Sequence, residues 1–270
     1  MSYIIWDIDP QVFSFSSIPR WYGIMWAVGV FLSYEVMQYV YRNESKTEKE
    51  LSALAIYIIT GTIIGARLGH VLFYDPVYYL NKPWEVLPIK LDNGFEFTGL
   101  SGLASHGGTV GILLALTLYC FKYKINYLWI ADRLAIAGAL CGGFIRIGNL
   151  LNSEIYGVTT SVPWAFIFTR IDQYPRHPTQ IYEALVYFFL FGLLLYFYRK
   201  GYFKNSNGLM FGLLLTLLFS FRFFVEFLKV DQEMIDYNTW FNAGQLLSVP
   251  LVLVGLFMVV FRIYRLKTNL

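Results

Sequence analysis

Long apolar runs alternate with short polar stretches along the whole chain. A helix needs about 20 apolar residues to cross the hydrocarbon core of a membrane. Seven runs have this length, at about residues 21–41, 51–73, 105–121, 128–148, 180–198, 208–228 and 244–264. Tryptophan and tyrosine residues flank several of the runs, as they do at membrane interfaces. The pattern predicts an all-α integral membrane protein with about seven transmembrane helices.

Two of the connecting segments are too long to be simple turns. Residues 75–100 and 150–179 should lie on the outer side of the membrane, and loops of this length are usually functional. In the first, residues 94–99 alternate in a strand-like way. We expect the two loops to form a small outward-facing head on a single polytopic domain that covers residues 1–270.

Composition and charge agree with a membrane location. Hydrophobic residues make up 57% of the chain and charged residues 14%, whereas soluble domains have about 25% charged residues. Eleven of the 21 Lys and Arg residues lie on one side of the predicted spans, seven lie on the other, and three fall inside runs. The positive-inside rule then places the N-terminus outside and the C-terminus in the cytoplasm.

The same observations exclude several classes of protein. Without a long basic block, a nucleic-acid ligand is not expected. The acidic residues Asp7 and Asp9 are unlike the start of a cleaved signal peptide. Cys120 and Cys141 lie in apolar runs without metal-ligand spacing, so we expect neither a disulfide nor a zinc site.

Small residues recur at four-residue spacing in two of the runs. Gly61, Gly65 and Gly69 form one such stripe, and Gly138 and Gly142 form another. Glycine at this spacing lets helices approach closely in lipid, so both stripes predict close helix packing. Arg67 lies within the first stripe, and we interpret it as structural or supporting.

Charged residues inside the membrane are costly and are usually paired and functional. Arg222 and Glu226 are four residues apart and share one face of a helix. They could form a neutralising ion pair only, but buried pairs stabilise weakly, which favours a functional role. Arg133, beside Asp132 near the cytoplasmic end of its run, is predicted to extend its side chain toward the water.

The densest polar cluster lies between Gly142 and Gly157. Arg146, Asn149 and Asn152 recur at every third position at the outer end of a run, and Glu154 follows them. The guanidinium of arginine matches phosphate oxygens, and asparagine can donate to the same oxygens. Polar residues that simply meet water at a helix end are the alternative, which the surrounding glycines disfavour. The cluster therefore predicts a phosphate-bearing ligand.

Histidine occurs three times. His106 lies where a loop becomes a span, and the glycines after it leave room for a substrate. If it is partly buried and neutral, it could accept a proton, although a lone histidine is more often structural. His177 belongs to a helix start that Thr179 could cap, and His70 carries little information.

These features suit an enzyme that transfers a lipid group at the outer leaflet without a metal or other cofactor. No Gly-x-Ser-x-Gly or Walker motif is present. A transporter or channel could show similar polar residues, but no convincing internal repeat was found. A seven-span receptor would not need so many glycines beside arginines. An intramembrane phosphatase or another phospholipid transferase remains possible on these residues alone.

Seven segments together resemble the bacterial prolipoprotein diacylglyceryl transferases. They run in the order of that family and cover nearly the whole chain. The Arg-x-Gly-Asn-x-x-Asn-x-Glu pattern that begins at Arg146 is the most specific. The segments are Trp21–Gly23, Gly65–Gly69, Ser105–Gly108, Arg146–Gly157, Arg176–Gln180, Phe221–Phe223 with Glu226, and Gly244–Pro250. Departures are mild: Ile145, Leu150, Ser101, Leu103 and Lys229 replace residues that are more usual in the family.

The resemblance implies a seven-span enzyme of the bacterial cytoplasmic (inner) membrane with an outer head. Its partners would be phosphatidylglycerol and the lipobox peptides of preprolipoproteins within a lipid bilayer. The enzyme would move the diacylglyceryl group onto the lipobox cysteine thiol and release glycerol phosphate. His106 would be the general base, Arg146 would bind the donor phosphate, and Arg222 would stabilise the leaving phosphate. The residues expected to shape the pocket are Tyr22, Asn149, Glu154, Gly157 and Glu226.

Overall fold

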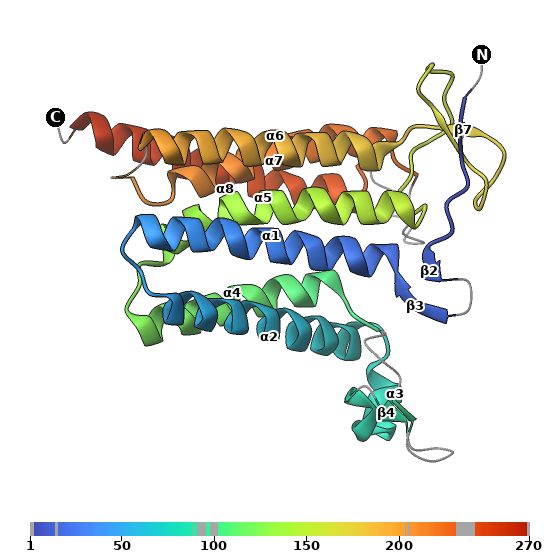
Figure 1. The fold of residues 1–270 in the computed structure, drawn as a ribbon, viewed down its shortest axis with the longest axis horizontal. Helices are drawn as coiled ribbons and strands as arrows, with labels where there is room; N and C mark the ends of the chain where they lie inside the picture. The colour runs from blue at the N-terminus through green and yellow to red at the C-terminus, as the bar shows by residue number, and fades with distance from the viewer. Residues whose placement is uncertain are drawn as a thin grey trace. The chain divides into compact units, whose positions relative to one another are not determined.

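The computed structural model describes residues 3–13, 16–87, 89–90, 96–97, 102–202, 204, 206–230 and 241–268. Within this part of the chain, seven helices have 17 residues or more (Figure 1). They are α1 (Trp21–Asn43), α2 (Glu48–Phe73), α4 (Ser105–Tyr123), α5 (Tyr127–Leu151), α6 (Thr179–Lys200), α7 (Leu209–Val225) and α8 (Ala243–Thr268). Each coincides with one predicted run, so the helical assignment is confirmed.

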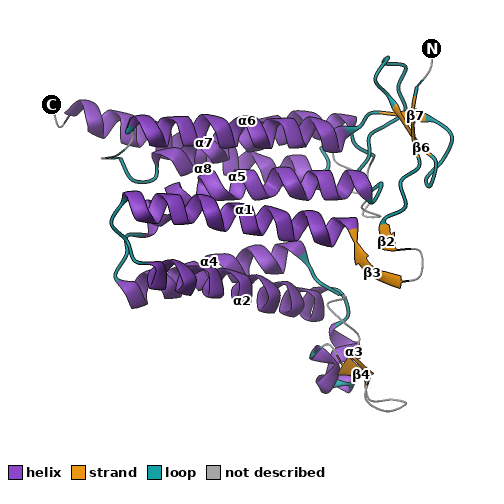
Figure 2. Ribbon diagram, viewed as in Figure 1, coloured by secondary structure: helices purple, strands orange, loops and turns teal. Residues whose placement is uncertain are grey.

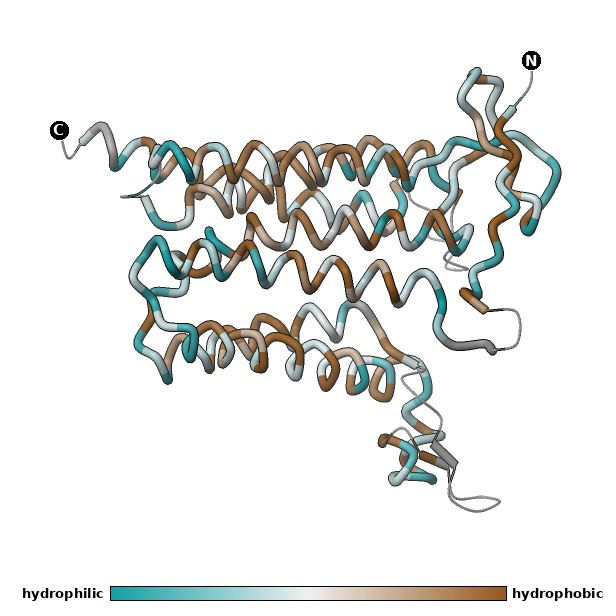
Figure 3. Tube along the Cα trace, in the orientation of Figure 1, coloured by the Kyte–Doolittle hydropathy of each residue, from teal (hydrophilic) through white to brown (hydrophobic). Residues whose placement is uncertain are grey.

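Five of these helices are long and apolar enough to cross a membrane, namely α2, α5, α6, α8 and α7 with the 3-10 turn η2 (Glu226–Leu228) that extends it. In Figure 3 the apolar colour runs along the long helices, and many hydrophilic residues lie in the connections. The chain is therefore a multi-pass membrane protein. The described α1 and α4 are not among the five.

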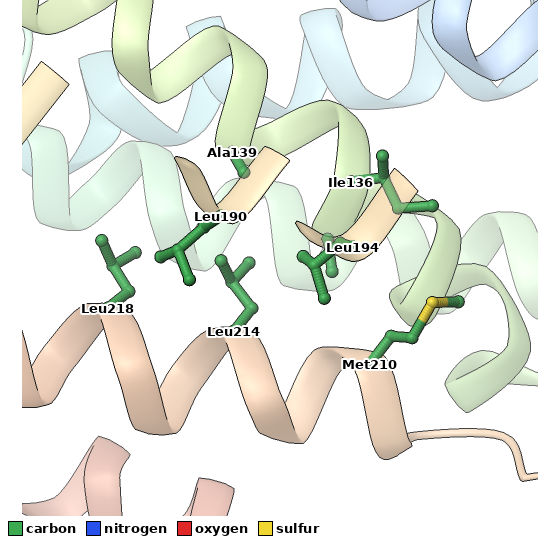
Figure 4. Close-up of a cluster of buried hydrophobic side chains, with 8 residues drawn as sticks. Ile136, Ala139, Leu190, Leu194, Met210, Leu214 and Leu218 are labelled. Atoms are coloured by element: carbon green, nitrogen blue, oxygen red, sulfur yellow. The ribbon is translucent and has the colours of Figure 1, made fainter. Parts of the chain in front are cut away.

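The described chain divides into two compact units, residues 1–40 with 128–270 and residues 41–127. In the first unit, α5, α6 and α7 pack around a buried apolar cluster (Figure 4). Helix α5 contributes Ala135, Ile136 and Ala139, and α6 contributes Leu190 and Leu194. Met210, Leu214 and Leu218 of α7 complete the cluster. This packing fixes the three helices that carry most of the candidate site.

Short strands lie outside the long helices and were mostly not predicted (Figure 2). Strand β1 (Ile4–Trp6) pairs in parallel with β6 (Phe166–Phe168), which pairs antiparallel with β7 (Pro175–Arg176). Phe166 and Phe168 pack on Leu150, and the indole of Trp6 donates to the Leu150 carbonyl at 3.0 Å. The sheet thus holds the end of α5. A separate hairpin joins β2 (Gln11–Phe13) and β3 (Ser16–Arg20).

In the second unit, α2 and α4 pack with their backbones in close contact, as the glycine stripe predicts. A Cβ atom added to Gly65 would lie 2.4 Å from the carbonyl oxygen of Gly107. At Gly61 it would lie 2.5 Å from the Cβ of Ala115, and at Gly69 it would lie 2.7 Å from the Cα of Gly107. The prediction for this stripe is confirmed, because only glycine fits these positions.

The second stripe is confirmed only in part. A Cβ atom at Gly142 would lie 2.4 Å from the ring of Tyr187 on α6, so this glycine does allow close packing. At Gly138, by contrast, it would meet no atom of the described chain within 4 Å. Close packing at Gly138 was therefore a wrong prediction.

Replacing Gly65 with alanine is expected to destabilise the protein by about 2 kcal/mol, because the new methyl group would push α2 and α4 apart. The matched control is Gly192→Ala in α6, where an added Cβ atom meets nothing within 4 Å. That change should be neutral or stabilising, since alanine favours helix over glycine. Thermal unfolding of both variants in detergent measures the difference, and equal stabilities would contradict the packing argument.

The first long loop contains the short helices α3 (Pro76–Asn81) and η1 (Pro83–Val86) and the strand pair β4 (Ile89–Lys90) and β5 (Glu96–Phe97). The strand-like alternation is thus confirmed at residues 96–97, while 94–95 and 98–99 lie outside the described residues. Arg67 holds this loop: its Nε donates to the Val86 carbonyl at 2.8 Å, and its Nη1 donates to the Gly102 carbonyl at 3.2 Å. These bonds support the structural interpretation of Arg67.

Asp132 and Arg133 are both buried within the first unit. The Asp132 carboxylate accepts the N–H groups of Gly208 and Phe211 at 2.7 and 2.8 Å, so it caps the start of α7. Arg133 stacks over the Trp129 ring at 4.7 Å, and its side chain is only 4% exposed. The prediction that Arg133 reaches out to the water is wrong, because Trp129 and Asp132 hold it inside.

Replacing Asp132 with alanine is expected to destabilise the fold by about 3 kcal/mol, because two N–H groups at the start of α7 lose a charged acceptor. Asp132→Asn keeps one acceptor oxygen and should cost less. Asp75→Ala is the control, since Asp75 is the N-cap of α3 but makes no side-chain capping bond. The measurement is thermal unfolding in detergent; an Asp132→Ala protein as stable as the control would refute the capping role.

Candidate active site

The polar end of α5 forms one side of the site. Arg146 lies inside the helix and not in a loop, and its Nη1 donates to the side-chain oxygen of Asn149 at 3.3 Å. The Asn149 amide donates to a Glu154 oxygen at 3.2 Å, and the Asn152 amide donates to the other at 3.0 Å. Arg146 and Asn149 share one face of α5, and Asn152 and Glu154 follow directly after its end, so the structure brings the predicted cluster together.

The loop that follows α5 has an unusual backbone. Ser153 and Ile155 both have φ of 56°, in the left-handed region that side chains rarely adopt. The Thr179 hydroxyl donates to the Ile155 carbonyl at 2.7 Å, and the Gln180 amide donates to the Glu154 carbonyl at 2.6 Å. Thr179 is thus not the helix cap that was predicted. Together with Gln180, it holds the strained loop that presents Glu154.

Glu183, one turn into α6, is the carboxylate nearest to Arg146. Its Oε2 lies 3.4 Å from the Nε of Arg146. The side chain of Glu183 is 3% exposed and that of Arg146 is 12% exposed. The guanidinium of Arg146 therefore contacts the Glu183 carboxylate through Nε, the Asn149 amide oxygen through Nη1, and the Tyr187 side chain.

Arg222 and Glu226 form the predicted ion pair at the end of α7. Glu226 Oε1 lies 3.6 Å from the Nε of Arg222 and also accepts from the Lys229 ammonium at 2.9 Å. Lys229 in turn donates to Glu183 Oε1 at 3.1 Å. A Cβ atom at Gly244 would lie 2.7 Å from the Glu226 carboxyl carbon, so glycine there makes room for this group.

The contacts form one continuous row of alternating charges across α5, α6, α7 and η2. The row runs from Arg146 through Glu183, Lys229 and Glu226 to Arg222. It contains three cations and two anions, so its net charge is one positive. Such a row can bind one phosphodiester group, which carries a single negative charge.

Gly157 connects the loop to this row. Its N–H donates to the His177 carbonyl at 2.9 Å, and it forms a β-bridge with Lys229. A Cβ atom there would lie 2.6 Å from both the His177 Cβ and the Leu228 carbonyl oxygen. Glycine is thus required for the backbone approach that places Lys229 beside Glu183.

Tyr22, at the start of α1, lies against the same end of α5. A Cβ atom at Gly148 would lie 3.0 Å from the Tyr22 ring and 3.3 Å from its Cα. The Tyr22 hydroxyl is also close enough to interact with Glu154 and Arg146. Seven of the predicted site residues lie in the first unit, residues 1–40 with 128–270. They are Tyr22, Arg146, Asn149, Glu154, Gly157, Arg222 and Glu226.

His106 belongs to the other unit, residues 41–127. It lies in the first turn of α4, as predicted, but it is exposed and not partly buried. It lines one end of an apolar cavity of about 790 Å³ between α2 and α4, together with Gly65, Gly69 and Gly107.

A separate ion pair, outside the charged row, lies in the loop before α6. Arg176 Nε donates to both Asp172 oxygens at 3.2 and 3.1 Å, and this bonding lowers the pKa of the Asp172 carboxyl. Arg176 Nη1 donates to the Gly157 carbonyl at 3.2 Å. Burial lowers the pKa of His177, whose ring lies 3.1 Å from the Tyr182 hydroxyl. These contacts support the structural interpretation of this segment.

Two members of the charged row, Glu183 and Lys229, were not predicted as site residues. Glu183 is a carboxylate within an apolar run, which is itself a signal of function. Lys229 lies three residues after Glu226, a spacing at which two helical side chains meet.

Within the described residues, no three His, Cys, Asp or Glu side chains are placed to share a metal ion.

Comparisons with known proteins give the family. The sequence model of the family described as Prolipoprotein diacylglyceryl transferase matches residues 10–261. A phosphatidylglycerol--prolipoprotein diacylglyceryl transferase of Bacteroides fragilis is 48% identical over 262 residues, which cover 96% of this chain and 95% of the relative. Proteins with the same name from Chloroherpeton thalassium and Tolumonas auensis are 44% and 45% identical; the matches cover 96% and 94% of this chain and 94% and 95% of those relatives. The chain therefore belongs to the prolipoprotein diacylglyceryl transferase family.

Proposed function

We propose that this protein transfers the diacylglyceryl group of phosphatidylglycerol to the lipobox cysteine thiol of preprolipoproteins, the first step of bacterial lipoprotein modification. The proposal rests on family membership and on one observation, the mostly buried row of charges that includes Arg146 and has a net positive charge. A row of this charge suits the phosphodiester of an anionic phospholipid at membrane depth.

The reaction is a substitution at carbon. The cysteine sulfur forms a bond to the glycerol carbon that carries the phosphate, and the bond between this carbon and the phosphate oxygen breaks. Glycerol phosphate leaves, and the thioether product keeps both acyl chains. Since the leaving phosphate gains one negative charge, positioned cations lower the barrier.

Each site residue then has a role in this reaction. Arg146 binds the phosphate of the donor, and Arg222, the more exposed arginine of the row at 37%, stabilises the phosphate as it leaves. Tyr22, Asn149, Glu154, Gly157 and Glu226 shape the pocket around them. Asn149 and Glu154 do so by orienting Arg146 through the hydrogen bonds at the end of α5.

His106 is the proposed general base. The thiolate is the nucleophile, and a free cysteine is mostly protonated at neutral pH, so a base must take the thiol proton. His106 lies in the first turn of α4 and lines the apolar cavity there, whereas the adjacent Gly107 packs against Gly65 of α2. Its exposed side chain is consistent with access by a substrate.

We further propose seven spans with the site near the outer leaflet of the bacterial cytoplasmic membrane. Helices α1 and α4, with 23 and 19 residues, are long enough to add to the five apolar spans. The Lys and Arg distribution places the N-terminus outside and the C-terminus inside. Residues 75–100 and 150–179 then form the outward head.

The test is direct. The purified protein is incubated with phosphatidylglycerol and a lipobox peptide, and the peptide is weighed by mass spectrometry. A gain of one diacylglyceryl mass is expected, and a peptide with serine in place of cysteine should gain none. If glycerol phosphate is released without a gain in peptide mass, the protein is a lipid hydrolase and the proposal fails. It fails equally if neither product forms.

A further inference from the structure

Lys229 occupies the centre of the charged row, where its two ion-pair partners are carboxylates. Its ammonium lies 3.1 Å from Glu183 Oε1 and 2.9 Å from Glu226 Oε1. The side chains of Lys229, Glu183 and Glu226 are 7%, 3% and 10% exposed. The single positive charge of Lys229 thus partly balances the negative charges of two carboxylates, Glu183 and Glu226.

Each of these carboxylates also faces one of the two proposed catalytic arginines. Glu183 contacts Arg146 at 3.4 Å, and Glu226 contacts Arg222 at 3.6 Å. Both distances exceed the 2.7–2.9 Å that is usual for charge-assisted hydrogen bonds. Glu183 Oε2 is buried and has no partner with hydrogen-bond geometry in the described structure. The arginines are therefore oriented by the carboxylates but only loosely bound to them.

The loose contacts follow from the position of Lys229. Because the ammonium carries much of the charge balance, neither carboxylate depends on its arginine as the only counter-ion. Without Lys229, two buried anions would need Arg146 and Arg222 for neutralisation, since an unpaired buried charge is very costly. The guanidiniums would then be drawn toward the carboxylates and away from a bound phosphate.

We infer that Glu183 and Lys229 form a positioning pair that holds Arg146 and Arg222 at the spacing needed for the donor phosphate. This inference rests on the proposed function, because it concerns the same reaction. Neither residue needs to touch the substrate: both are more deeply buried than the arginines that they orient. A displacement of about 1 Å in such a site can cost on the order of 100-fold in rate.

The experiment compares Glu183→Gln, Lys229→Gln, Lys229→Arg and the double variant Glu183→Gln/Lys229→Gln, with kcat, KM for phosphatidylglycerol and thermal unfolding measured for each. The single glutamine variants should lower kcat/KM by about 10- to 100-fold and reduce the melting temperature. Lys229→Arg should keep activity within a few-fold, because a guanidinium can contact both carboxylates. Glu48→Gln and Lys200→Gln, which change exposed residues, are the controls.

The double variant separates positioning from stability. Removing both charges together restores the net charge of the row to one positive and leaves Glu226 paired with Arg222, so the melting temperature should recover part of the way toward that of the wild type. Activity should stay at least 10-fold below the wild type, because Arg146 has lost its carboxylate. Recovery of activity together with stability would overturn the inference, as would wild-type activity in either single variant. Transfer by the wild-type protein in the same assay tests the proposed function separately, so the two failures are distinguishable.

Discussion

Replacement of Arg146 with glutamine is expected to lower diacylglyceryl transfer by about 100- to 1000-fold, the usual cost of losing a positioned donor at a developing charge. Arg146 contacts both Asn149 and Glu183, so it joins the polar end of α5 to the charged row. The variant should still fold, because Glu183 keeps Lys229 as its counter-ion at 3.1 Å. The measurement is kcat/KM for phosphatidylglycerol with the mass-spectrometric peptide assay.

Arg146→Lys should also be strongly impaired, because a lysine ammonium cannot present the planar fork of donors that matches phosphate oxygens. Arg199→Gln is the matched control: Arg199 lies exposed in the last turn of α6 and should tolerate the change. If Arg146→Gln turned over at the wild-type rate while remaining folded, the charged row would not be the phosphate site.

The second large effect is expected at His106. His106→Ala should lower kcat by about 100-fold or more, since general bases contribute about 10²–10⁴-fold to rates. Val110→Ala, one turn further along α4 and lining the same cavity, is the control for a loss of volume. Unchanged turnover with purified lipid and peptide would show that another group removes the thiol proton.

The sequence predicted the helices and the local parts of the site well. A helix of about 20 apolar residues has a strong signal of its own, so the seven runs agree with the helices to within a few residues. The pairs within one helix, Arg146 with Asn149 and Arg222 with Glu226, follow directly from three- and four-residue spacing.

The contacts between distant segments could not be predicted in this way. Glu183 meets Lys229 across 46 residues, and nothing in either local sequence indicates this partner. Thr179 resembled a helix cap because of its place after Pro178, yet a carbonyl 24 residues earlier accepts its hydroxyl. Arg133 resembled an interfacial arginine, but packing on Trp129 decided its position. In each case tertiary contacts prevailed over a local rule.

The pairing of β1 with β6 has a consequence for the order of folding. Ile4 is made before its partner Phe166, and four long helices of the chain lie between them. Contacts between segments so far apart in sequence form late, because a long loop must be closed first. Strand β1 should therefore remain unpaired until β6 has been synthesised. A bulky fusion before Tyr3 would lie next to β1 while this strand is still unpaired. A tag after the end of α8 is therefore the better choice for preparing the folded enzyme.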